Sequence, residues 1–276
     1  MKKFKTALVL LSLCGFCTAL PAQQPAAGSS KQPQAAGKRV PQAKTHAEFT
    51  DYNAAYATAG GAAVEKAADE FAAKYPASEL KAFLYAKAMH EYQNENNPPK
   101  MLNVGEKVLQ VDPDNSVALV LTSTVLADSL KDADTDRQAK IDRARKNATH
   151  ALETVDSSFV PPANATPEQV TQYKSTLQSM AHSALGIVAL KMGDDATAEN
   201  ELKLSTSLNV GQPDPYLWYH LALAQDHQKK YPEALVSINH ALQVMGGNTD
   251  LGELAQGEQK RLLTLTGGNA PLPAPK

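Results

Sequence analysis

The chain has 276 residues, of which 43% are hydrophobic, 20% are charged and only 6% are aromatic, and its formal net charge is −2. These proportions exclude a collagen, a disulfide-rich scaffold, a multi-span membrane protein and a strongly basic nucleic-acid-binding protein. Few β-branched and aromatic residues beside many alanine, leucine, lysine, glutamate and glutamine residues favour closely packed helices over a large sheet.

The N-terminal segment has the three parts of a secretory signal peptide. A short basic start precedes an uncharged, mostly apolar run at 6–20, and Ala22 then offers a small residue at a cleavage point. The run is shorter than the ~20 residues of a membrane-spanning helix. We therefore expect residues 1–22 to be removed, with a retained anchor as the alternative. Both cysteines, Cys14 and Cys17, lie inside this segment, so the mature chain has no thiol chemistry.

Two polar segments flank the rest of the mature chain. Residues 23–44 consist mainly of glutamine, proline, alanine, glycine, serine and lysine, with Val40 as the single large apolar residue. Such a composition cannot bury enough apolar surface to offset its ordering entropy, so it predicts a disordered linker. Residues 267–276 are rich in proline and glycine and predict a second disordered tail.

Between the tails, apolar residues recur with helical spacing, and glycine or proline interrupts them at regular intervals. Thr166 and Asp214, each followed by proline, are typical helix N-caps, and Ser78 is a third candidate. The sequence predicts no strand and eleven helices, over 46–58, 62–75, 78–95, 98–111, 115–130, 135–156, 166–192, 194–208, 214–230, 232–245 and 249–265.

The predicted helices form pairs with a recurring pattern. In the last pair, Trp218, Leu221 and Ala222 lie on one face of the first helix, and Ala234, Ile238 and Ala241 lie on one face of the second. This spacing resembles the tetratricopeptide repeat (TPR), a 34-residue helix pair with W-x2-L-G-x2-Y in its first helix and A-x3-F in its second. Gln225 stands at the usual tyrosine position.

Other pairs resemble the repeat less closely. Leu185 and Gly186 match the first helix of the preceding unit, and Ala198 and Leu202 match its second helix. Residues 82–115 form a third unit with Tyr85, Tyr92 and Pro113 at matching places. Residues 116–156 fit only if extra residues around 131–136 lengthen the turn, and residues 45–76 lack a clear first-helix pattern.

The resemblance implies an all-α fold, a right-handed α-solenoid of about five TPR-like pairs over residues 45–266. The helix at 249–265 would cap its C-terminal end, because a solenoid needs a polar outer face where stacking stops.

No catalytic constellation, cofactor motif or metal site is predicted. The seven histidines lack metal-ligand spacing. Residues 132–136 resemble the start of a calcium-binding loop, but Arg137 stands at the position where such a loop requires glycine. Ser78 and Lys81 have the spacing of a serine–lysine pair without its companion motifs, and helix capping is the simpler interpretation.

In the resembling family, the first helices of successive pairs line a concave groove that holds peptides or partner helices. Transferred by register, the groove is expected to present apolar and aromatic side chains with few cations. Its predicted lining consists of Phe83, His90, Asn94, Val120, Thr124, Ser183, Ile187, Tyr216, Tyr219, Leu223 and His227. The alternative is that the repeats curl tightly and bury these residues against one another.

We therefore expect an exported, non-catalytic adaptor or scaffold that binds a protein or peptide partner, with no nucleic acid and no small-molecule substrate. The basic start and the lack of further cysteines indicate a bacterial periplasm or cell envelope. Membrane contact is expected at most through an uncleaved signal segment. A structural subunit of an oligomeric envelope or secretion assembly is one alternative, and an unrecognised envelope hydrolase is another.

Overall fold

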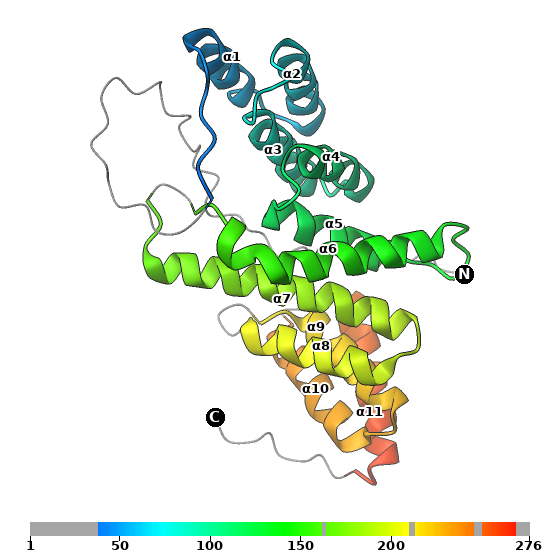
Figure 1. Ribbon diagram of the computed structural model, residues 1–276. Coiled ribbons are helices and arrows are strands. Elements are labelled where there is room, and N and C mark those ends of the chain that lie inside the picture. The colour runs from blue at the N-terminus through cyan, green and yellow to red at the C-terminus, as the bar shows by residue number, and fades with distance from the viewer. Residues whose placement is uncertain (1–37, 162–163, 210–212, 246–249, 269–276) are drawn as a thin grey trace.

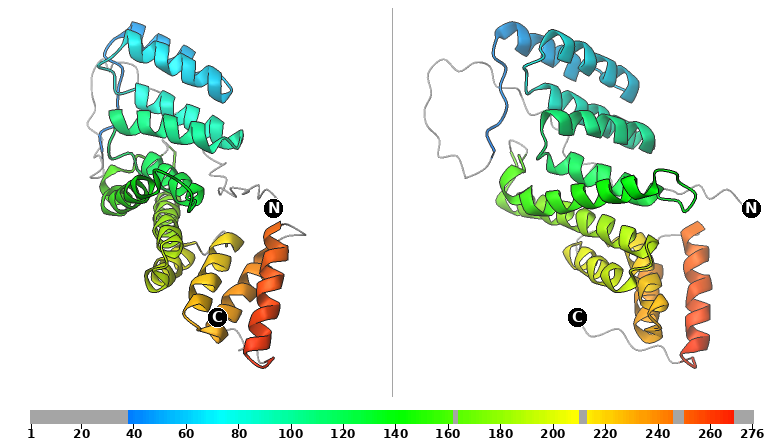
Figure 2. Two further views of the ribbon diagram at one scale, coloured as in Figure 1. Left: turned by 90° about the vertical axis from the view of Figure 1, so that its right-hand side faces the viewer. Right: turned by 45° about the vertical axis from the view of Figure 1, so that its right-hand side comes forward.

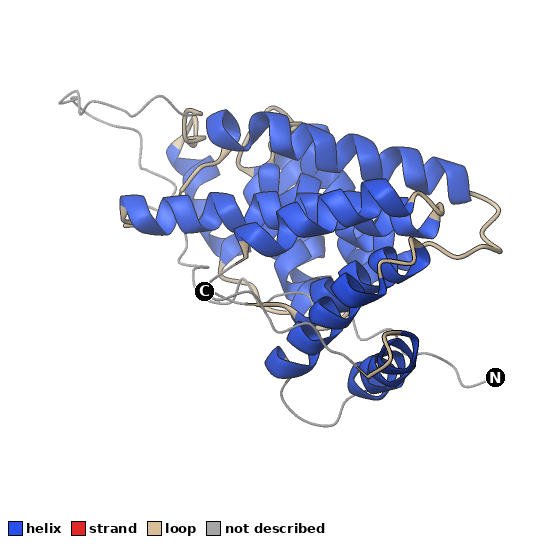
Figure 3. Ribbon diagram, turned by 90° about the horizontal axis from the view of Figure 1, so that it is seen from below, coloured by secondary structure: helices blue, strands red, loops and turns tan. Residues whose placement is uncertain are grey.

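The computed structural model describes residues 38–161, 164–209, 213–245 and 250–268 (Figure 1). Within these residues there are eleven α-helices and no β-strand (Figure 3). The helices are α1 (His46–Tyr56), α2 (Gly61–Lys74), α3 (Lys81–Asn94), α4 (Pro98–Val111), α5 (Ser116–Ser129), α6 (Arg137–Ser158), α7 (Pro167–Lys191), α8 (Asp195–Leu208), α9 (Pro215–His227), α10 (Tyr231–Val244) and α11 (Asp250–Leu265). The predicted all-α class is confirmed, and the predicted helix ends differ from these by at most three residues.

Consecutive helices pack in pairs, from α1 with α2 to α9 with α10, and each pair packs on the next. Helix α11 packs on α10 and covers the C-terminal end of the stack, as predicted for a cap. Figures 1 and 2 show α1–α4 at one end, the long helices α6 and α7 across the middle, and α8–α11 at the other end. The arrangement is that of an α-solenoid of five helix pairs with a capping helix.

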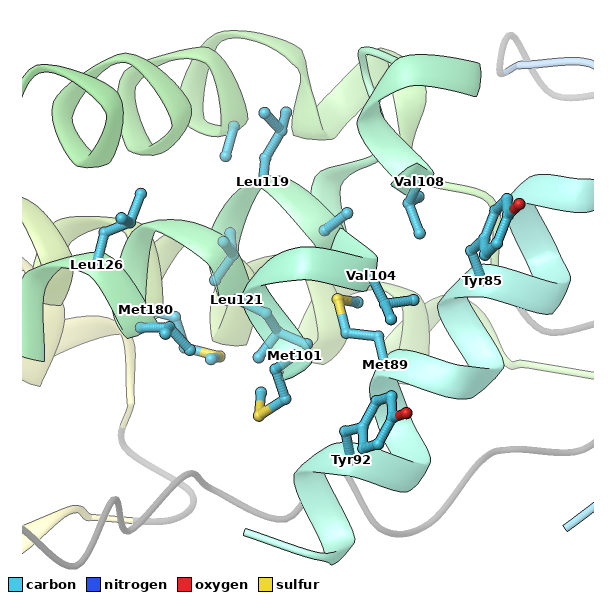
Figure 4. Close-up of a cluster of buried hydrophobic side chains, with 14 of the residues drawn as sticks. Tyr85, Met89, Tyr92, Met101, Val104, Val108, Leu119, Leu121, Leu126 and Met180 are labelled. Atoms are coloured by element: carbon cyan, nitrogen blue, oxygen red, sulfur yellow. The ribbon is translucent and has the colours of Figure 1, made fainter. Parts of the chain in front are cut away.

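A buried core runs through the stack because each pair leaves an apolar face that the next pair covers. Its largest cluster extends from α1 to α7, and two smaller clusters follow around α8–α9 and α9–α11. In the close-up of Figure 4, Met89 of α3 lies beside Val104 of α4, and Met101 lies near Leu121 of α5. All four side chains are buried.

Most residues of the predicted repeat signature lie in this core. Those that are buried are Tyr85, Tyr92, Gly186, Ala198, Leu202, Leu221, Ala222, Ala234, Ile238 and Ala241. Leu185 is half-buried, and Pro113 is exposed in the loop between α4 and α5. Trp218 is also only half-buried, and its indole stacks on the His240 imidazole with ring centroids 4.6 Å apart.

Gly186 shows why small residues are needed where paired helices cross. A Cβ atom added there would lie 2.7 Å from Cγ of Leu202, which is closer than real Cβ contacts allow. Helix α8 can therefore approach α7 closely only while position 186 carries no side chain.

Two of the three predicted N-caps are confirmed. The Thr166 hydroxyl accepts a hydrogen bond from the Gln169 amide, and the Gln169 side chain accepts one from the Thr166 amide, which completes a capping box. Asp214 accepts from the Tyr216 amide at 2.9 Å. Ser78 does not cap α3, because its hydroxyl accepts from the Leu80 amide and the helix begins one residue later.

The turn between α5 and α6 has the predicted extra length. Its acidic residues are paired with cations: Asp134 accepts from Lys140 at 3.0 Å, and Asp136 lies 3.0 Å from the same ammonium group. Among the described residues, no cluster of three or more metal-ligating side chains is found.

The predicted linker is wrong at its C-terminal end. Residues 38–44, here called the N-terminal strap, are extended and contact the helical body, with Ala43 buried. The predicted signal peptide, the rest of the linker and most of the C-terminal tail lie outside the described residues. No helix in the described part of the chain is both long enough and apolar enough to cross a membrane.

Candidate functional site

A hollow of about 450 Å³ opens on the side of the stack formed by the first helices of the first four pairs. Helices α1, α3, α5 and α7 each contribute side chains to its lining, and the C-terminal end of α6 with the following loop closes one end. The hollow therefore lies on the face where the repeat resemblance placed a groove, but α8 to α11 contribute no residue to its lining.

The lining of the hollow is mainly apolar and aromatic. Tyr52 and Tyr56 come from α1, Phe83 from α3, and Phe159 and Tyr173 from opposite sides of the loop that joins α6 to α7. The rings of Phe159 and Tyr173 lie 5.9 Å apart at their centroids. Smaller aliphatic side chains also belong to the lining, namely Ala82, Ala86, Val111, Val117, Val160 and Leu177.

Packing of α1 against α2 in the first pair positions the aromatic residues of α1 that line the hollow. Tyr52 is 2% exposed and its ring meets that of Phe71 edge-on, with centroids 6.2 Å apart, which fixes α1 against α2. Burial raises the pKa of the Tyr52 hydroxyl far above its ordinary value, so this ring stays neutral at all physiological pH values.

Few charges face the hollow without a partner. The Lys87 ammonium donates to the backbone carbonyls of Tyr56, at 2.5 Å, and Thr58, so it caps the C-terminal end of α1. The side-chain nitrogen of Gln93 is buried and makes no hydrogen bond within the described residues. A ligand with a hydrogen-bond acceptor at this end of the hollow would satisfy that donor.

Only some of the predicted groove residues line the hollow. Phe83 and His90 line the hollow. Asn94 is exposed beside His90, whose Nδ1 lies 3.3 Å from the Asn94 amide nitrogen, and it does not belong to the lining. Whether Phe83 and His90 contact a partner stays a prediction.

Part of the predicted lining on α5 and α7 is corrected. Val120, Ser183 and Ile187 are 0%, 7% and 1% exposed, so they cannot line an open groove in this conformation. The reason is that α7 packs directly on α5 and also contacts α9, which closes the space between the first helices. The alternative of self-packed repeats therefore holds at these three positions.

The remaining predicted groove residues lie outside the hollow. Tyr219 and Leu223 are half-buried on α9, and Tyr219 packs against the cluster under α11. His227 is exposed, and its Nδ1 lies 2.8 Å from a carboxylate oxygen of Asp195. Thr124 is half-buried on α5, with a buried hydroxyl that has no hydrogen-bond partner among the described residues.

A buried cluster of polar side chains lies where α5, α7 and α9 meet. The Tyr216 hydroxyl donates to a carboxylate oxygen of Asp128 at 3.0 Å. The Lys191 ammonium donates to the carbonyls of Ala127 and Asp128, both at 2.8 Å, at the C-terminal end of α5. His220 lies beneath the Tyr216 ring, and its Nδ1 is 2.8 Å from the Tyr216 carbonyl oxygen.

Burial sets the protonation of this cluster. It raises the pKa of the Asp128 carboxyl to about 6 and lowers the pKa of the His220 imidazole to about 4. It also raises the pKa of Tyr216 and lowers that of Lys191. Each polar group is satisfied by a neighbour inside the protein, so the arrangement fits a structural junction better than a catalytic site.

Sequence reasoning missed most of the aromatic lining. Tyr52 and Tyr56 lie in the pair that lacked a clear repeat pattern, and Phe159 and Tyr173 flank a loop that no repeat register covers. The signal available was the concentration of aromatic residues in the N-terminal first helix, since the whole chain has only 6% aromatic residues.

The comparison with solved structures finds similar chains. A solved structure of a thermophilic TPR protein from Thermus thermophilus aligns with 79% of this chain and 99% of its own, at a TM-score of 0.45 and 15% identity. No family model matches the chain, and no curated protein matches it.

Proposed function

We propose that the protein is a non-catalytic binding scaffold that holds a segment of a partner protein in the hollow between α1, α3, α5 and α7. The observation that carries this proposal is the apolar and aromatic lining on one open face, supplied by four successive helix pairs. Apolar pockets with aromatic anchors are typical of sites that bind peptide or helix side chains. We expect the bound segment to present aliphatic or aromatic side chains toward Phe83 and Tyr173.

A peptide-display experiment tests the proposal without knowledge of the natural partner. A library of random dodecapeptides is selected on the chain beginning at Gln23, and the enriched peptides are measured against variants by fluorescence anisotropy. The groove variant is Phe83→Ala with Tyr173→Ala. The matched control is Leu204→Ala with Leu265→Ala, which removes two exposed apolar side chains from α8 and α11.

We expect enriched peptides to bind the groove variant at least about 30-fold more weakly, because the two lost aromatic contacts together remove about 2 kcal/mol or more of apolar burial. The control should bind as the wild type does. Selection of no peptide, or equal binding by the wild type and the groove variant, would contradict the proposal.

We further propose that the scaffold acts outside the cytoplasm, in the periplasm or cell envelope of a bacterium. The basic start, the apolar run at 6–20 and the small residue at Ala22 support export. A fusion of residues 1–44 to alkaline phosphatase should be active only after export, and N-terminal sequencing of the product should begin at Gln23. An inactive fusion with an intact N-terminus would refute this part of the proposal.

A further inference from the structure

The N-terminal strap crosses the edge of the hollow. From its junction with α1 it runs beside the loops that join successive helix pairs, toward the loop after α6, as Figures 1 and 2 show. Lys38, Arg39 and Pro41 of the strap belong to the lining of the hollow. The strap therefore forms part of the edge of the hollow.

The two ends of the strap are held differently. At its C-terminal end Ala43 is buried, and the Lys44 amide donates to a carboxylate oxygen of Glu48 at 2.7 Å. At its N-terminal end, side-chain ion pairs bind it to the body. Arg39 Nη2 donates to Glu79 Oε2 at 2.6 Å, and the Lys38 ammonium pairs with Asp112.

The two ion pairs at the N-terminal end differ in exposure, because the Lys38 and Asp112 side chains are only 33% and 21% exposed. The Arg39 and Glu79 side chains are 65% and 54% exposed, and exposed pairs of this kind stabilise a contact only weakly. The strap is therefore fixed at residues 43–44, whereas one exposed and one half-buried ion pair hold residues 38–41. Charge also favours rebinding of the strap to the rim of the hollow. Residues 1–45 contain no acidic residue, and the rim presents the carboxylates of Glu79 and Asp112.

We propose that residues 38–41 cover one edge of the hollow and that a partner segment must displace them before it binds. This inference rests on the proposed function, because it takes the hollow as the binding site. The strap is covalently attached at the rim, so its high effective concentration compensates for weak contacts. Binding of a partner should then become tighter whenever the strap is released.

Charge reversal in the full mature chain tests the proposal. In the strap variant, Lys38→Glu with Arg39→Glu, the strap is repelled by the acidic rim. The matched control is Lys66→Glu with Arg143→Glu, which changes net charge equally at exposed ion pairs on α2 and α6, outside the hollow. The probe is Nile red, an uncharged dye whose fluorescence increases in apolar sites, and thermal unfolding confirms that each variant is folded.

We expect the strap variant to bind Nile red about three- to tenfold more tightly than the wild type, with the control unchanged, since each weak ion pair contributes a small factor. Phe83→Ala added to the strap variant should remove the gain, which would place the dye in the hollow. Raising NaCl from about 0.05 M to about 0.5 M should increase dye binding by the wild type more than by the strap variant, because salt screens exposed pairs.

Equal dye binding by the strap variant and the wild type would overturn the inference, and so would an equal gain in the control. These outcomes are distinguishable from failure of the proposed function. If peptide binding depends on Phe83 while strap reversal changes nothing, the hollow binds partners and the strap does not compete. If dye binding rises but no peptide is selected, the strap covers the hollow and the proposed function is wrong.

Discussion

The contact between Gly186 and Leu202 joins α7 to α8 and can be tested by substitution at both positions. A methyl group at position 186 would lie 2.7 Å from Cγ and 3.1 Å from Cδ2 of Leu202, and 3.3 Å from Cβ of Glu201. Gly186→Ala gains about 1 kcal/mol of helix propensity. Overpacking of the buried interface costs about 1–3 kcal/mol. We therefore expect a net destabilisation of about 1 kcal/mol.

Leu202→Ala removes the atoms that clash. Leu202 is 0% exposed, so this substitution alone should cost about 3 kcal/mol through lost burial and an unfilled cavity. In the double variant the new methyl group at position 186 enters that cavity and keeps its helix propensity. The double variant should therefore be about 2 kcal/mol more stable than the sum of the two single effects predicts.

Urea unfolding monitored by tryptophan fluorescence measures this coupling. Trp218 is the single tryptophan of the chain and packs against the same cluster as Leu202, so its emission reports on this part of the solenoid. A local reporter is needed because repeat arrays need not unfold in one step. Gly257→Ala combined with Leu202→Ala is the control, since a Cβ at position 257 meets no neighbour within 4 Å. Additivity within about 0.5 kcal/mol for the Gly186 pair would refute the packing argument.

Four further substitutions test local features of the fold. Gly193→Ala should destabilise the fold by about 1 kcal/mol because φ is +77° at this position. Gly257→Ala, inside α11, should stabilise the fold by about 1 kcal/mol through higher helix propensity. Equal effects of the two substitutions on the unfolding free energy in urea would contradict this. Thr166→Ala should cost about 1 kcal/mol and accelerate amide exchange in the first turn of α7, and unchanged exchange at Gln169 would refute the capping box. The pKa of Asp128 is raised to about 6 in the folded protein, so its ionisation opposes folding as the pH rises from about 4 to above 6. Asp128→Asn should therefore gain up to about 3 kcal/mol relative to the wild type between about pH 4 and pH 7, and a pH-independent difference in unfolding free energy would contradict this.

The helices and their pairing could be predicted from the sequence because their causes are local. Apolar spacing of about 3.6 residues, proline after Thr166 and Asp214, and glycine at position 193 act within a few residues of chain. The repeat signature also fixed which faces pair, since Ala198 and Leu202 meet α7 as the register requires.

The extent of the open surface was decided only by tertiary packing. A repeat register places Val120 and Ile187 on the inner face of the solenoid, but it does not say whether successive inner faces touch. That depends on the rotation between pairs, which long-range contacts such as the hydrogen bond from Tyr216 to Asp128 determine across 88 residues of sequence. The inner faces of α5 and α7 therefore close on each other at Val120 and Ile187, while a hollow stays open beside α1 and α3.

Tertiary contacts also decide the structure of the N-terminal strap, which the sequence did not predict to be ordered. The composition of residues 23–44 contains too little apolar side chain to predict order, and that inference is sound for an isolated segment. Its last seven residues are ordered because the folded body supplies Glu79, Asp112 and a site for Ala43 beside the first pair. The sequence by itself determined the helices, their order and the repeat. The closed junction, the aromatic hollow and the strap exist only because packing brings distant residues together.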